Sequence, residues 1–130
     1  MKRDLDLVRK ILIAIEDKPN LEPEEITIQE YEFEVVAFHL LILKEAGLVD
    51  AVMSEDAAGE LIGAFAIRLT WNGFEFLDLA RNDTVWNKSK KFLKEKAVSV
   101  SVGVLTEVLK SILKDTLGLS GFQNLPQQPV

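Results

Sequence analysis

The stretches that decide the fold are HLLILKEAGLVDAV at residues 39–52 and RLTWNGFEFL at residues 68–77. The first reads as the end of a helix, because Gly47 can take the left-handed backbone conformation that closes a helix. Strand-like residues follow over 48–53 and again over 61–69, and the loop SEDAAGE between them is polar and contains a glycine. That arrangement is typical of a β-hairpin. The two stretches together therefore predict a helix that leads directly into a hairpin.

Two further elements are predicted on the N-terminal side. A helix is expected over residues 4–18, because its apolar residues recur at steps of three and four and Pro19 ends the pattern. The acidic segment 21–30 contains one brief strand at its ITI core. A helix over 31–47 follows, with these residues expected to face inward: Phe33, Val36, Ala37, Leu40 and Leu43.

Capping residues predict two helices after the hairpin. Thr70 is placed to cap a helix that ends near residue 81, and Asp83 to cap a helix that ends near residue 96. The order helix, short strand, helix, hairpin, helix is the winged-helix layout. We therefore expect an α+β, helix-rich, winged-helix-like domain, with a two- or three-stranded antiparallel wing sheet and added C-terminal helices.

Residues 97–117 fit two patterns. VSVSVGV alternates with period two, as in a strand, whereas the apolar residues also recur at helical steps of four and three. Length and charge favour a helix, at least from Ser101, and leave 98–104 open. This C-terminal helix, about 98–117, would either wrap the core or pair with its copy in a homodimer. The seam available for dimerisation consists of Val98, Val102, Leu105, Leu109 and Ile112.

The composition narrows the class of protein. The 130 residues suit one domain, predicted over 1–117, with a polar, proline-bearing and flexible tail over 118–130. Cysteine is absent, which excludes disulfides and zinc–thiolate sites and suits a cytoplasmic location. We see neither a signal peptide nor the roughly 20 apolar residues of a membrane span. No catalytic motif or phosphate-binding loop is found, so neither an enzyme nor a cofactor is expected.

Three segments carry a resemblance to a known family. They are KRDLDLVRKILIAIE at residues 2–16, HLLILKEAGL at residues 39–48 and LTWNGFEFLDLARNDTVWNK at residues 69–88. Together they resemble the DUF2513 family, small proteins of bacteria and their phages. The family pattern has a histidine where this chain has Phe74, so no histidine function carries over to that position. The resemblance implies the same winged-helix-like fold and supplies no catalytic or binding residue.

The histidine and the aromatic residues are candidate site residues. His39 is the only histidine, and a lone imidazole is more often a structural group bonded to the backbone than a metal or catalytic site. Trp71, Phe74 and Phe76 follow the second wing strand, and Trp86 lies near the start of the next helix. Exposed, they would mark a partner hot spot, but with so few aromatics we expect both tryptophans to be buried.

Charge is distributed unevenly along the chain, whose net charge is −6. Between residues 16 and 60, thirteen acidic residues are opposed only by Lys18 and Lys44. In a DNA-binding winged helix, the helix before the wing enters the major groove and the wing tip touches phosphates. Here that helix begins EYEFE and the wing tip reads SEDAAGE, so phosphates would be repelled. This face is wrongly charged for DNA.

Three functional hypotheses follow. The first is a non-enzymatic protein-interaction module, which would act as a bacterial or phage regulatory protein. Its acidic face would contact a protein partner through these residues: Glu30, Glu32, Glu34, Glu55 and Asp56. The alternative is a DNA-binding transcriptional regulator that uses the basic helix 88–96, with these residues on phosphates: Lys88, Lys90, Lys91 and Lys94. Nucleic acid is the less favoured partner, and no membrane contact is expected. An enzyme with a pair of carboxylates is a third hypothesis.

Overall fold

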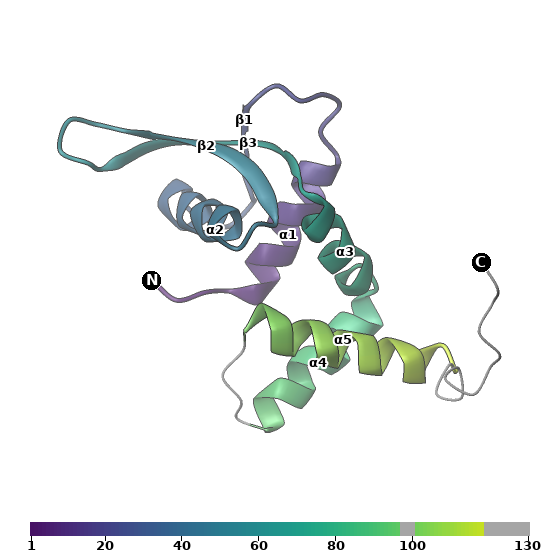
Figure 1. Cartoon of the computed structure of the whole chain (residues 1–130). Helices are drawn as coiled ribbons and strands as arrows, with labels where there is room; N and C mark the ends of the chain where they lie inside the picture. Colours follow the sequence, from purple (N-terminus) through teal and green to yellow (C-terminus); the bar gives the residue numbers. More distant parts are fainter. Residues whose placement is uncertain (97–100, 119–130) are drawn as a thin grey trace. The chain divides into compact units, whose positions relative to one another are not determined.

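The computed structural model describes residues 1–96 and 101–118, and the chain divides into two compact units, Met1–Asp78 and Leu79–Val130. Within the described residues the protein is α+β, with five helices and a three-stranded antiparallel sheet (Figure 1). The predicted fold class is confirmed, and the order of the elements is compatible with a winged helix. Residues 97–100 of the ambiguous segment, and the predicted tail from residue 119, lie outside the described residues. A single domain over 1–117 stays a prediction.

Helix α1 (Leu5–Glu16) begins at a side-chain cap. The Asp4 carboxylate accepts hydrogen bonds from the backbone N–H groups of Asp6 and Leu7, at 2.9 and 3.2 Å. These bonds satisfy two of the donors that the first turn of a helix leaves without partners. The predicted stripe faces the interior of the first unit, where these residues are buried: Leu7, Val8, Ile11, Leu12 and Ile15.

Helix α2 (Phe33–Glu45) begins two residues later than the sequence predicts. Glu30 has a backbone φ of +75°, which is uncommon for a residue other than glycine, and this turn delays the helix. Glu32 occupies the cap position without a side-chain hydrogen bond. The expectation that Phe33 faces inward is wrong, because its side chain is 38% exposed at the first turn. The buried residues of α2 are Val36, Ala37, His39, Leu40 and Leu43.

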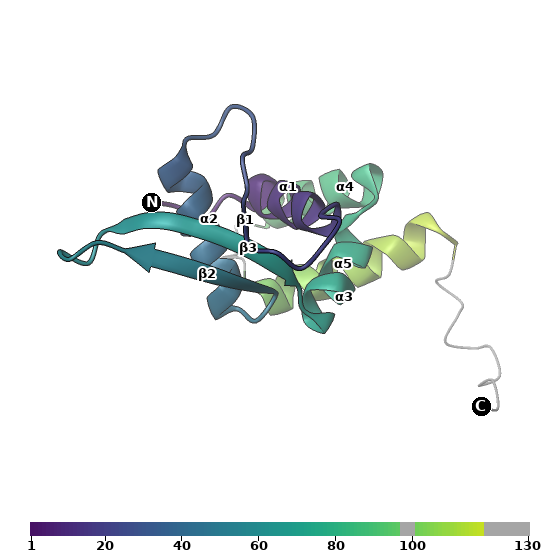
Figure 2. The same cartoon turned by 90° about the horizontal axis from the view of Figure 1, so that it is seen from above.

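The sheet consists of β1 (Glu24–Glu25), β2 (Val49–Glu55) and β3 (Leu61–Leu69), in the order β1-β3-β2 with antiparallel pairing. The brief strand was expected at the ITI core but lies just before it. Both α1 and α2 pack against the sheet, and Figure 1 shows them on the same face of it. From above, α2 crosses the hairpin of β2 and β3, whose loop extends beyond the helix (Figure 2).

A clamp joins the end of α2 to the start of α3 (Trp71–Ala80). The Thr70 N–H donates to the carbonyl of Leu48 at 3.0 Å, and the Thr70 hydroxyl donates to the carbonyl of Gly47. The same hydroxyl accepts the N–H of Gly73 at 3.1 Å, which confirms Thr70 as the cap. A Cβ on Gly73 would lie 2.0 Å from the Leu48 oxygen, so only glycine fits there. The hydrogen bonds of Thr70 and the close approach at Gly73 thus account for these two residues of the LTWNG segment.

The second unit contains α4 (Asp83–Glu95) and α5 (Val102–Thr116), which pack against each other. Asn82, and not Asp83 as predicted, caps α4, because its side-chain oxygen accepts the Val85 N–H at 3.0 Å. Ser101 caps α5 through a bond from the Val104 N–H at 3.1 Å. The helical reading of the ambiguous segment is therefore confirmed from Ser101 onward. Among the described residues, none of these helices is long and apolar enough to cross a membrane.

Candidate interaction surface

His39 is a structural residue. Its ring is fully buried, and Nε2 accepts the Asp4 N–H at 2.8 Å while Nδ1 lies 2.8 Å from the carbonyl oxygen of Val35. A backbone N–H can only donate, so Nε2 carries the lone pair and Nδ1 carries the proton that Val35 accepts. The imidazole is therefore held as one neutral tautomer with both nitrogens occupied. The prediction of a histidine bonded to the backbone is confirmed.

Tyr31 joins the same network from the loop that precedes α2. Its hydroxyl donates to the Asp4 carboxylate at 3.2 Å, and the Lys10 ammonium lies 5.5 Å from the centre of its ring. Burial raises the pKa of the Tyr31 phenol, and the negative charge of Asp4 raises this pKa further. Asp4 thus holds three segments together: the start of α1, the loop at Tyr31 and, through its N–H, helix α2. The arrangement ties these three segments to one another within the first unit.

The surface at the start of α2 is acidic and apolar. Glu30, Glu32 and Glu34 are all exposed, and the half-exposed Phe33 lies between the last two. Further along the outward side of α2, three large apolar residues are half-buried: Phe38, Leu41 and Ile42. No lysine or arginine occurs anywhere in residues 19–43. We call the surface of residues 30–34 with the outward side of α2 the acidic–apolar face.

The wing tip carries the other two predicted contact residues. Glu55 and Asp56 are exposed, but one Asp56 oxygen is already engaged, accepting the N–H groups of Ala58 and Glu60 at 2.9 Å each. Gly59, with a φ of +85°, completes this loop. The five predicted acids thus come from two segments, the start of α2 and the hairpin loop, and both views place this loop beyond α2 (Figures 1 and 2). The Asp56 carboxylate therefore stabilises the conformation of the wing-tip loop and also contributes negative charge to it.

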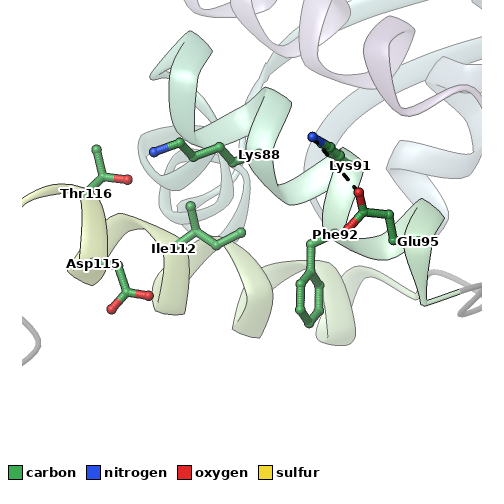
Figure 3. A pocket seen from close by; sticks show the side chains of 7 residues that line it. All are labelled: Lys88, Lys91, Phe92, Glu95, Ile112, Asp115 and Thr116. Carbon is green, nitrogen blue, oxygen red and sulfur yellow. Dashed lines mark ion pairs between the residues drawn. The ribbon is translucent and has the colours of Figure 1, made fainter.

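The basic residues of the alternative hypothesis lie on α4. Lys88, Lys91 and Lys94 are exposed, whereas Lys90 is half-buried. Lys91 is 4.0 Å from Glu95, and both line a pocket of about 410 Å³ that also contains Asp115 of α5 (Figure 3). Carboxylates therefore alternate with the ammonium groups here. A phosphate at this pocket would meet charges of both signs.

The structure separates the two tryptophans. Trp86 is buried as expected, at 1% exposure, but the expectation is wrong for Trp71, which is 76% exposed at the first turn of α3. Phe74, one turn later, is 44% exposed, whereas Phe76 is buried. Trp71, which was expected in the core, and Phe74 are therefore both exposed aromatic residues of α3.

The apolar seam proposed for dimerisation is partly covered within the chain. Leu105 and Leu109 are buried in the second unit, where α5 packs on α4, and Val102 and Ile112 are half-buried. Val98 lies outside the described residues. A homodimer through this seam stays a prediction, and the remaining exposed part of it is small.

Comparison with known proteins places the chain in a recognised group. The model of a family described as "Hypothetical protein (DUF2513)" matches residues 2–99, which is more than half of the chain. An uncharacterized protein of Haemophilus influenzae is 35% identical over 121 residues, which cover 90% of this chain and 99% of that protein. No solved structure matches the chain.

Proposed function

The chain belongs to the DUF2513 family, and we propose that it is a cytoplasmic, non-enzymatic protein-interaction module that binds a basic protein through its acidic–apolar face. The observation that carries this proposal is the composition of α2. At the position where a winged helix reads DNA, this helix presents carboxylates and large apolar side chains and no cation before Lys44. A regulatory role in a bacterium or a phage fits such a module.

Physical chemistry favours a protein over DNA at this face. A carboxylate 4 Å from a phosphate is repelled by about 1 kcal/mol even in water, and it contributes nothing to counterion release. A basic protein is attracted by the same carboxylates that repel a phosphate, and this attraction speeds its encounter with the face. Phe33 between Glu32 and Glu34 matches the usual anatomy of an interface, in which a large apolar residue is ringed by polar groups.

The decisive experiment removes the charge and keeps the shape. We expect the triple variant Glu30→Gln, Glu32→Gln and Glu34→Gln to lose capture of its protein partner from the native host, measured by quantitative mass spectrometry. Glutamine suits position 30 because a positive φ costs glutamine and glutamate about the same free energy. The substitution should therefore change the stability little.

A control variant changes the net charge by the same amount elsewhere. The exposed residues Glu75, Glu95 and Glu107 lie outside the acidic–apolar face, and their replacement by glutamine should leave capture intact. Capture that survives in the first variant, or is lost equally in both, would reject the face as the contact site.

The exposure of three lysines on α4 supports a second candidate, a DNA-binding regulator that contacts phosphates through Lys88, Lys90, Lys91 and Lys94. This candidate predicts DNA binding that weakens steeply as salt increases, with a slope that falls by roughly one for each lysine removed. A mobility-shift assay at low salt measures it. Absence of any shift with the full chain would remove this candidate and leave the first.

A further inference from the structure

The first unit carries a groove that is separate from the acidic–apolar face. Its volume is about 300 Å³, and it lies between the end of α1, the loop that follows, the end of β3 and Phe74 of α3. Its apolar lining consists of Ile15, Leu21, Ile67, Leu69 and Phe74, with Pro19. Leu21 is 68% exposed and Phe74 is 44% exposed, so two large apolar side chains meet solvent here.

A buried lysine holds one wall of this groove in place. The Lys18 side chain is only 3% exposed, and its ammonium donates to the carbonyls of Asn20 and Glu22 at 3.0 and 2.6 Å. The ammonium also lies 3.8 Å from the Glu24 carboxylate, and the Asn20 side chain accepts the Glu22 N–H at 3.0 Å. The loop is therefore fixed with Leu21 turned outward. A preformed apolar wall binds with less loss of conformational entropy than a mobile one.

The opposite wall is equally firm. Phe74 belongs to α3, whose first turn is clamped by Thr70 and by the close approach of Gly73 to Leu48. Trp71 lies one helical turn before Phe74 and extends the exposed apolar surface of this helix. The charged side chains that line the groove are those of Glu16, Lys18 and Arg68, whereas the exposed Glu22 and Glu75 lie on the loop and on α3 outside its lining. Lys18 is paired with Glu24, and Arg68 is paired with Asp50 at 2.8 Å, so carboxylates balance both cations and the groove suits an apolar side chain.

The second unit of the same chain presents a surface of that kind. Phe92 on α4 is 43% exposed, with Lys88 and Lys91 lining the same pocket and the Lys96 ammonium 5.7 Å from the centre of its ring. Figure 3 shows Phe92 directed away from the Lys91–Glu95 ion pair. Glu95 and Asp115 line the pocket as well, so the complement to the apolar groove is the exposed Phe92 ring itself, carried by a unit of net positive charge.

The net charges of the two units are opposite in sign, which supports the same pairing. Residues 1–78 contain seven basic and 17 acidic residues, a net charge of −10, whereas residues 79–130 contain eight basic and four acidic residues, a net charge of +4. Two copies of the chain would repel each other on average, with a net charge of −6 each. They attract when the second unit of one approaches the first unit of the other.

We propose that the groove between Leu21 and Phe74 binds the Phe92 surface of a second copy of this chain. The contact joins two different surfaces, so each copy offers one groove and one Phe92 surface. It involves neither residues 30–34 nor the outward side of α2, so it is independent of the proposed function.

Sedimentation velocity tests the proposal on the full chain. The protein should associate as its concentration rises from about 1 μM to about 1 mM, the range in which weak contacts form. Association should weaken at least tenfold when the Debye length falls from about 30 Å at 0.01 M salt to about 3 Å at 1 M salt. A chain that stays monomeric over the whole range at low salt overturns the proposal.

Two variants assign the surfaces. The groove variant carries Leu21→Ser and Phe74→Ser, and the α4 variant carries Lys88→Glu and Phe92→Ser. All four residues are exposed, so both variants should keep the wild-type circular dichroism spectrum and melting temperature. Each variant alone should associate at least about tenfold more weakly than the wild type.

Mixing gives the sharpest result. An equimolar mixture of the two variants should recover a complex of one copy of each, because the α4 variant keeps its groove and the groove variant keeps its Phe92 surface. A control with Val52→Ser and Ile62→Ser removes two exposed apolar residues of the hairpin and should associate like the wild type. A mixture that remains monomeric, or a control that loses association, refutes the assignment.

Discussion

Gly73 shows most directly how one residue position determines the structure around it. The N-terminal turn of α3 approaches the end of α2 so closely that a methyl group added at this position would overlap the carbonyl of Leu48, at 2.0 Å. The opposing atom is backbone, which moves less easily than the tip of a side chain. The hydroxyl of Thr70 lies in the same place and bonds to both partners of the clamp.

We therefore expect Gly73→Ala to destabilise the protein by about 1–3 kcal/mol, the usual range for forced overpacking. The matched control is Gly103→Ala in the first turn of α5, where the nearest atom to a new Cβ is the Ser101 hydroxyl oxygen at 3.8 Å. That change should be neutral or stabilise by up to about 1 kcal/mol. Urea unfolding followed by circular dichroism measures both, and equal effects would contradict the close approach.

Tyr31 gives the protein a sensitivity to alkaline pH. Burial and Asp4 raise the pKa of its phenol in the folded state, so the unfolded chain loses this proton first. The corresponding stability is complete below the ordinary tyrosine pKa of about 10, and it is lost as pH rises through the higher folded pKa. We expect the free energy of unfolding to fall more steeply above about pH 10 in the wild type than in Tyr31→Phe. Parallel pH profiles would show that the phenol is not the cause.

At the scale of single elements, the cap of α4 offers a clear test. Asn82 makes the capping hydrogen bond, and the neighbouring Asp83 is already inside the helix. Replacing Asn82 by alanine should therefore destabilise the protein by about 1 kcal/mol, the usual effect of losing a cap. Asp83→Asn removes a negative charge from the first turn but leaves the Asn82 cap in place, so it should have the smaller effect. Thermal unfolding of the two variants measures both effects. A larger destabilisation by Asp83→Asn than by Asn82→Ala would favour Asp83 as the cap, as the sequence predicts.

Much of each element could be predicted because local patterns are strong. The stripe of α1, the glycine that ends α2, the hairpin and the helix from Ser101 all follow from periodicity and capping, and the structure confirms them. The exposure of Trp71 could also have been predicted. The buried positions of α3 are Gly73, Phe76, Leu77 and Ala80, at steps of three, one and three. Trp71 lies on the opposite side of a helix with that stripe.

Other features depend on contacts between distant residues, which no local pattern reports. The Asp4 N–H meets the His39 ring across 35 positions of sequence, and Tyr31 meets Asp4 across 27. The positive φ of Glu30 occurs at a residue type that rarely adopts it, so the late start of α2 had no signal. For the candidate site, the structure shows the five predicted acids as exposed residues, and their role in binding stays a prediction. The half-buried apolar residues on the outward side of α2 were missed, because helical periodicity identifies one buried side and gives no role to apolar residues outside it.

For the whole molecule, the separation of charge between the two units is the dominant feature. The 17 acidic residues of the first unit repel one another at low ionic strength and oppose its folding. We expect the melting temperature to rise by several degrees as salt increases, because salt screens this repulsion. The measurement is made by calorimetry at low protein concentration, where copies do not associate. A melting temperature that falls with salt would mean that attractive ion pairs outweigh the repulsion.

The contrast between Trp71 and Trp86 gives the protein two built-in optical reporters. The chain has no other tryptophan, and one indole faces water while the other is enclosed. Water shifts indole emission to longer wavelength and admits acrylamide as a quencher, so the two signals can be separated in a single spectrum. In a Trp86→Phe variant, the remaining fluorescence would come from the surface of α3 alone and would report the arrival of a neighbour there without any attached dye.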